Sequence, residues 1–124
     1  MNSPWFTAFL MIAVDIALVV VMRMAASGRL KRNSWAGIRL PATITSEAAW
    51  VVAHKTALPF IWVTAVVNAV LSVTVLLLGA QPNLSTLVLT SLGLVVLIVG
   101  LIYASARGIR AARVLGPSST STKK

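Results

Sequence analysis

Three apolar stretches of roughly 20 residues each are the strongest constraint on how this chain folds. They cover about residues 5–25, 58–78 and 84–106, and the first is interrupted only by Asp15 and, near its end, by Arg23. A bilayer core about 30 Å thick needs roughly 20 helical residues, because peptide groups left unpaired in hydrocarbon are too costly. The sequence therefore predicts an all-α integral membrane protein with three transmembrane helices.

Composition and helix-ending residues agree with this architecture. Of the 124 residues, 58% are apolar and only 10% are charged, whereas about a quarter of residues are charged in soluble domains. Pro59 suits the first turn of the second helix, and the turn at 79–83 separates the second helix from the third. We expect a single membrane domain over residues 1–114 and a disordered cytoplasmic tail over residues 115–124, where apolar side chains are almost absent.

Positive charge near the predicted helices indicates their orientation. The eleven Lys and Arg residues border or fill the segment between the first two helices, or follow the third. Because such charges are retained on the cytoplasmic side, we expect the N-terminus outside and the C-terminus inside. The first stretch has no positive charge before it, so we expect a retained helix and not a cleaved signal peptide. The expected partners of these charges are the bilayer and its anionic headgroups, not nucleic acid.

Residues 27–57, the predicted cytoplasmic connector, mix basic residues with too many apolar side chains for a solvated linker. We expect this connector to lie on the membrane surface. Ser46 can cap a helix and Glu47 suits its N-terminus, so a short interfacial helix should begin here. Glu47, Trp50 and His54 would share one face of that helix. We expect Trp50 to anchor at the interface while Glu47 and His54 face water.

Residues for acid–base catalysis or metal binding are few. The chain has two carboxylates, one histidine and no cysteine, and Asp15 and Glu47 belong to regions half a bilayer apart. The sequence contains no paired carboxylates, phosphate-binding glycine loop or cluster of zinc ligands. We therefore expect a protein that is not an enzyme and has no catalytic residue, cofactor or metal.

Polar side chains inside the predicted helices form a different candidate site. The second helix carries a polar stripe at intervals of four residues, formed by Thr64, Asn68 and Ser72. The face with this stripe should be buried against protein. Asp15 of the first helix lies at a similar depth to Asn68, so the two could form a hydrogen bond. Two interpretations stay open, a proton- or ligand-responsive site and a bond that only holds helices together.

Small residues in the third helix favour close helix packing. Gly100, Ala104 and Gly108 are spaced so that another helix can approach closely. The partner is the first helix, the second helix or a second copy of the chain, so a homo-oligomer stays open.

A run of residues in the connector resembles the signature of the SdpI family of bacterial membrane proteins. That signature has an Asn four residues before a Gly-Ile-Arg, then a Pro, a Thr, a hydroxyl-rich helix start, a Trp and, four residues later, a His. The matching residues are Asn33, Gly37, Ile38, Arg39, Pro41, Thr43, Ser46, Trp50 and His54. The resemblance implies a non-enzymatic protein of the bacterial plasma membrane, acting in immunity to a membrane-active peptide toxin or in membrane-based signalling.

The chemistry of this motif indicates how it could act. Gly37 permits a turn closed to other residues, Pro41 stiffens the next step, and Arg39 could dock on Glu47 or on a lipid phosphate. We expect the motif to recognise a protein partner or lipid at the cytoplasmic face. Two other functions remain as alternatives, a small accessory subunit of a larger membrane complex and a proton-coupled exporter of small molecules that uses Asp15.

The predicted orientation can be tested with single cysteines, because the chain has none of its own. In intact cells, Ser85→Cys should react with a membrane-impermeant maleimide, whereas Ser34→Cys and Ser119→Cys should react only after permeabilisation. Labelling of Ser119→Cys in intact cells would show the opposite orientation.

Overall fold

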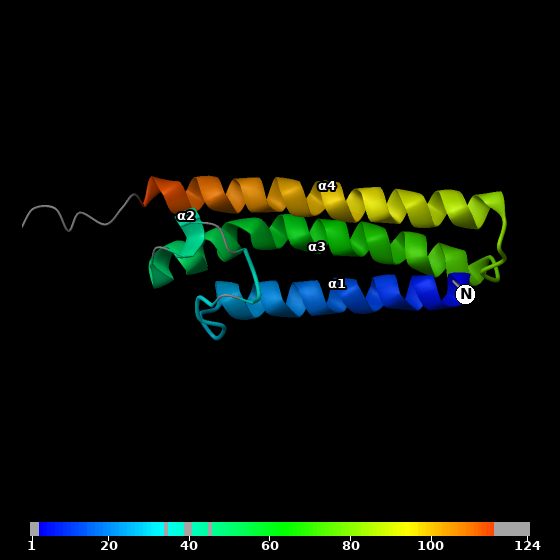
Figure 1. Cartoon of the computed structure of the whole chain (residues 1–124), viewed down its shortest axis with the longest axis horizontal. Helices are drawn as coiled ribbons and strands as arrows, with labels where there is room; N and C mark the ends of the chain where they lie inside the picture. The colour runs from blue at the N-terminus through cyan, green and yellow to red at the C-terminus, as the bar shows by residue number, and fades with distance from the viewer. Residues whose placement is uncertain (1–2, 34, 39–40, 45, 116–124) are drawn as a thin grey trace, which may run out of the picture.

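Helices are the regular elements of the part of the chain that the structure, a computed structural model, describes (Figure 1). The described residues are 3–33, 35–38, 41–44 and 46–115. The helices are α1 (Pro4–Ala26), α2 (Pro41–Ile44), α3 (Glu47–Leu77) and α4 (Leu84–Val114). Within the described residues α1, α3 and α4 are long and apolar enough to cross a membrane, so the expected three spans are confirmed. The expectations for Arg39 and for a disordered tail over 116–124 lie outside the described residues.

The central helix of the fold is α3, which lies between α1 and α4 (Figure 1). Both neighbours run antiparallel to it, and α1 and α4 make few contacts with each other. The three long helices therefore form a layer in which most tertiary packing involves α3. Its apolar core includes Val19, Met22, Ile38, Ala57, Ile61, Ala65 and Ala104.

Side-chain caps fix where α3 and α4 begin. The hydroxyl oxygen of Ser46 accepts a hydrogen bond from the backbone N–H of Ala49 at 3.0 Å, so the predicted helix start at Ser46 is confirmed. At α4, the side-chain oxygen of Asn83 accepts from the N–H of Thr86 at 2.9 Å. Each cap satisfies one of the backbone donors that a helix leaves free in its first turn.

The helix that begins after Ser46 is not a separate interfacial element, and that prediction was wrong. It is the first part of α3, which runs without a break through Pro59 to Leu77. Pro59 therefore lies inside the helix instead of in its first turn. An interior proline costs about 3 kcal/mol in a soluble helix, but membrane helices tolerate it where a neighbour supports them. Here α4 packs against α3 on both sides of Pro59, at Ala53 and at Thr64. It continues to Val114 instead of ending near residue 106.

Small residues on α4 make its contact with α3 unusually close, which identifies α3 as the partner left open by the sequence. Ala104 is fully buried in this contact. A Cβ atom added to Gly108 would lie 2.6 Å from the backbone oxygen of Ala53, and one added to Gly100 would overlap the side chain of Thr64. Only glycine allows the two backbones to approach this closely.

The lengths of α3 and α4 place their ends outside the hydrocarbon. Each has 31 residues, which corresponds to about 46 Å against a bilayer core of about 30 Å. Residues 56–77 and 84–106 carry no charge and are about as long as the core is thick. The excess length therefore lies at one end, which we call the basic end. Its described basic residues are Arg23, Arg29, Lys31, Arg32, Lys55, Arg107, Arg110 and Arg113.

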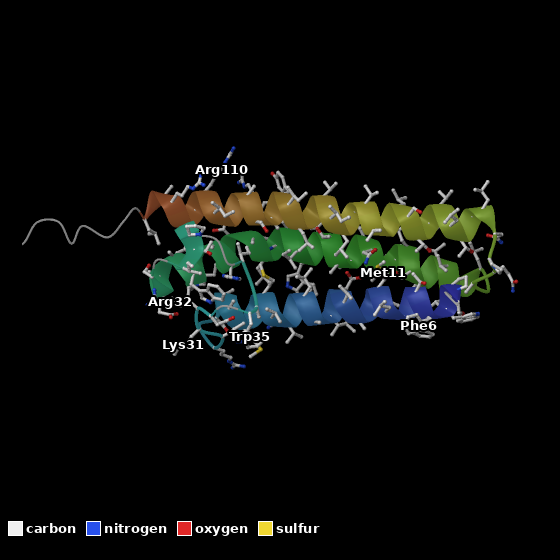
Figure 2. The ribbon with its side chains drawn as sticks, in the orientation of Figure 1. Phe6, Met11, Lys31, Arg32, Trp35 and Arg110 are labelled. Carbon is white, nitrogen blue, oxygen red and sulfur yellow. The ribbon has the colours of Figure 1, made fainter. Side chains whose placement is uncertain are left out.

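Figure 2 shows Lys31, Arg32, Trp35 and Arg110 toward the same end of the molecule, with Arg110 on α4 and the other three on the opposite side of the helix layer, and Phe6 toward the other end.

Candidate functional site

Two polar arrangements are candidates for function, and the first is a hydrogen-bonded pair in the middle of the membrane-spanning helices. The side-chain amide nitrogen of Asn68 donates to both carboxyl oxygens of Asp15, at 3.0 and 2.9 Å. Both side chains are buried, so the pair joins α1 to α3. The expected hydrogen bond between Asp15 and Asn68 is therefore present.

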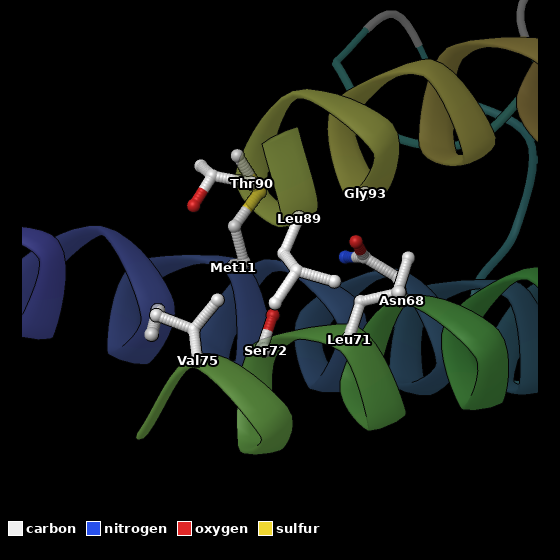
Figure 3. Close-up of a pocket in the computed structure, with 9 residues that line it drawn as sticks. Met11, Asn68, Leu71, Ser72, Val75, Leu89, Thr90 and Gly93 are labelled. Atoms are coloured by element: carbon white, nitrogen blue, oxygen red, sulfur yellow. The ribbon is translucent and has the colours of Figure 1, made fainter. Parts of the chain in front are cut away.

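The other two residues of the polar stripe do not join this pair. The hydroxyl of Thr64 donates to the backbone oxygen of Phe60 in its own helix at 2.8 Å. Ser72 lies beside a cavity of about 10 Å³ between the three long helices, together with Asn68 and Gly93 (Figure 3). That volume is of the order of one water molecule. An organic solute has no room on this side of the pair.

The second arrangement is at the basic end, where Trp50 and His54 lie in the first turns of α3. Neither side chain has exposed surface. The expectation that Trp50 anchors at the interface and His54 faces water was therefore wrong. Their ring centroids are 4.2 Å apart, and both rings contact the chain segment between α1 and α3. The described residues of this segment, 27–33, 35–38, 41–44 and 46, are called the folded loop. The indole N–H of Trp50 donates to the backbone oxygen of Leu30 at 2.8 Å.

The hydrogen bonds of His54 determine its tautomer. Its Nε2 accepts from the backbone N–H of Ile38 at 3.0 Å, and its Nδ1 lies 2.7 Å from the backbone oxygen of Trp50. Because Ile38 can only donate through its N–H, Nε2 carries no proton. Nδ1–H therefore donates to Trp50, and the imidazole is neutral. The ring thus accepts a hydrogen bond from the folded loop through Nε2 and donates one to the backbone of α3 through Nδ1.

Gly37 allows the folded loop to lie directly on these rings. Its φ of +90° is a conformation that other residues rarely adopt. A Cβ atom there would lie 2.6 Å from Nε2 of His54 and 2.9 Å from Cη2 of Trp50. On the other side of the turn, the hydroxyl of buried Thr43 donates to the backbone oxygen of Ile38 at 2.6 Å. Both backbone groups of Ile38 thus have partners from the motif.

The remaining motif residues also serve the loop itself. The side-chain oxygen of Asn33 accepts from the backbone N–H groups of Trp35 and Ala36, at 2.9 and 2.8 Å, and closes a turn. Its amide nitrogen donates to the backbone oxygen of Lys31 at 2.8 Å. Pro41 begins α2, where its fixed φ suits a first helical position.

Glu47 is exposed and pairs with Arg32, whose Nε lies 3.4 Å from its carboxylate. A second nitrogen of Arg32 donates to the backbone oxygen of Ile44 at 3.1 Å. The predicted docking of Arg39 on Glu47 falls on a residue outside the described part of the chain. Within the described residues, no three His, Cys, Asp or Glu side chains come together as a metal site requires.

Sequence reasoning missed Arg32 and Leu30. Leu30 acts through its backbone oxygen, which every residue has, so no side-chain pattern could have identified it. Arg32 is one of several basic residues in a segment that has no helical or strand periodicity. Its charge, opposite to that of Glu47, was the only sequence feature that indicated an ion pair. The motif residues thus build the folded loop, and their polar groups are largely used inside it.

Removal of the acceptor on His54 should loosen the folded loop. In His54→Phe the buried N–H of Ile38 loses its partner, at a cost of about 1–3 kcal/mol. We expect a lower Tm in detergent and faster tryptic cleavage after Arg29 and Lys31 than in the parent protein. Lys55→Gln, at the exposed neighbouring position, should leave loop cleavage unchanged. Equal cleavage of His54→Phe and the parent would contradict this role of the imidazole.

Comparison with known proteins gives one match. The sequence model of the SdpI/YfhL protein family matches residues 29–104, which contain most of the folded loop, all of α3 and most of α4. Searches of the curated proteins and of the solved structures found no match. The matched segment covers well over half of the 124 residues and includes the whole run of motif residues from Asn33 to His54. The chain is therefore a helical membrane protein that belongs to the SdpI/YfhL family.

Proposed function

We propose that this chain is a non-enzymatic immunity protein of the bacterial plasma membrane and that it acts through the folded loop at its basic end. Membership of the SdpI/YfhL family supports an immunity-type function. The observation that carries the proposal is that Trp50 and His54 of α3 bind the backbone of the loop directly. A loop held in one shape loses little conformational entropy when it binds a partner.

The basic end is proposed to face the cytoplasm. Eight described basic side chains gather there, and Lys and Arg beside membrane spans are retained on the cytoplasmic side. The N-terminus of α1 would then face outside. The folded loop would lie where a cytoplasmic partner or the inner headgroup layer can reach it.

Recognition is proposed to depend on Trp35 and its basic neighbours instead of on the buried motif residues. Trp35 is 74% exposed, and Lys31 and Arg32 are exposed beside it in sequence (Figure 2). Trp and Arg are the residues most enriched among those that dominate binding energy at protein interfaces. Trp50 and His54 are buried, so they support this surface without being part of it. The same surface would serve membrane-based signalling if its partner is a signalling protein.

Substitution of the exposed tryptophan should separate recognition from folding. We expect Trp35→Ala to keep the free energy of unfolding within about 0.5 kcal/mol of the parent value, because no buried contact is lost. Its Tm should therefore be close to that of the parent protein. In sensitive bacteria that express the chain and are challenged with a membrane-active peptide toxin of the type for which the family is named, survival should fall about tenfold or more.

Trp5→Ala is the matched control, since Trp5 is also exposed but lies at the opposite end of α1. It should protect as well as the parent protein. Full protection by Trp35→Ala would exclude Trp35 from recognition, and absence of protection by the parent protein would refute the immunity function itself.

The exporter alternative makes a different prediction for Asp15. Asp15→Asn keeps an oxygen that accepts from Asn68 but removes the ionisable group, so we expect parental Tm and full protection. Asp15→Leu leaves the amide of Asn68 without its partner and should lower stability by about 1–3 kcal/mol. Thermal unfolding in detergent and the survival assay measure both. Loss of protection by Asp15→Asn at unchanged Tm would favour proton coupling, and a large loss of Tm would contradict the hydrogen-bond interpretation.

A further inference from the structure

A groove of about 340 Å³ lies between α1 and α3 on the surface that faces the bilayer. Ala65 and Ala69 of α3 line it, and their small side chains leave the space that a larger residue would fill. Ile16 and Val66 border it and are 60% and 55% exposed, so the groove opens toward lipid. Apart from Asp15 and Arg23 its lining is apolar or aromatic.

The length of the groove matches one leaflet. On α1 it extends from Ile12 to Arg23, a rise of about 16 Å along the helix axis. Half of a bilayer core about 30 Å thick is about 15 Å. The end of the groove at Ile12 therefore lies near the bilayer midplane, and the end at Arg23 lies near the headgroup level.

The end of the groove at headgroup level, on the basic end of the molecule, is positively charged. A second hollow, of about 410 Å³, shares Val20 and Arg23 with the groove and continues to Arg29. Trp62 lines the groove, and tryptophan is enriched at the depth of lipid headgroups. An arginine binds phosphate through two parallel N–H donors, which lysine cannot do.

The chain itself has too few acids to neutralise these two arginines. It contains only two acidic side chains. Asp15 is bound by Asn68, and Glu47 lies 3.4 Å from Arg32. An anion from outside the chain would balance the charge of Arg23 and Arg29, and the apolar groove beside them favours an anion that carries a hydrocarbon chain.

We propose that the groove binds one acyl chain of an anionic phospholipid whose phosphate is held by Arg23 and Arg29. Apart from Arg29, which lies at the start of the folded loop, the site uses residues of α1 and α3. It does not include Trp35, Lys31 or Arg32, so it is independent of the surface proposed for immunity. The bound lipid would cover the bilayer side of the Asp15–Asn68 pair, since Asp15 lines the groove.

Native mass spectrometry of the full chain in detergent, titrated with phosphatidylglycerol or with phosphatidylcholine of the same acyl chains, tests the site. We expect one phosphatidylglycerol to bind in preference to phosphatidylcholine. Arg23→Gln and Arg29→Gln should each weaken this binding about fivefold, since a basic residue near the headgroups is worth about 1 kcal/mol. Arg110→Gln, on exposed α4 surface, is the matched control and should bind as the parent does.

A second variant tests the acyl chain separately from the charge. Ala69→Phe fills the groove and leaves both arginines in place, so it should lose phospholipid binding while keeping the parental Tm. Ala17→Phe makes the same change on an exposed part of α1 and should bind normally. Unchanged binding in Ala69→Phe, or equal affinity for the two lipids, would refute the proposal. A parental dimer that Ala69→Phe converts to a monomer would also refute it, because the occupant would then be a second copy of the chain.

Discussion

The close contact between α3 and α4 supports the rest of the structure. α3 is the shared neighbour of the other two long helices, and Gly108 of α4 lies against the backbone of Ala53. Ala49, Ala53 and Ala112 form an apolar cluster just beyond this point. Without it, the first turns of α3 would lose α4 as a packing partner. Those turns carry Trp50, and Ile38 packs in the same apolar cluster as Ala104 of α4, so the folded loop depends on the contact between α3 and α4.

Local patterns in the sequence were sufficient for much of this fold. The three spans follow from uninterrupted apolar length, and the start of α3 follows from the capping hydroxyl of Ser46. The contact of Asp15 with Asn68 follows from depth, because each lies near the middle of an apolar stretch of about 20 residues and antiparallel packing brings these midpoints together. Each of these inferences uses the position of a residue along a helix, and helix geometry converts that position into a depth or a face.

The folded loop could not be predicted in this way. His54 bonds to Ile38, 16 positions away, and Trp50 to Leu30, 20 positions away, and in both cases the partner is a backbone group. An indole near a membrane surface usually anchors at the interface, so its burial against a loop has no sequence signal. Proline favours first turns, which predicts a helix start near Pro59, whereas α3 continues through this residue without a break.

The burial of polar motif residues has one physical explanation. A segment without regular structure that packs against helices must find partners for its backbone N–H and C=O groups, and secondary structure cannot supply them. Here His54, Thr43 and Asn33 supply them from their side chains. The described residues that carry the resemblance are therefore largely those that fix the shape of the loop. Residues without such bonds through their side chains, such as exposed Trp35, do not fix the shape of the loop, so a change there would leave the fold intact.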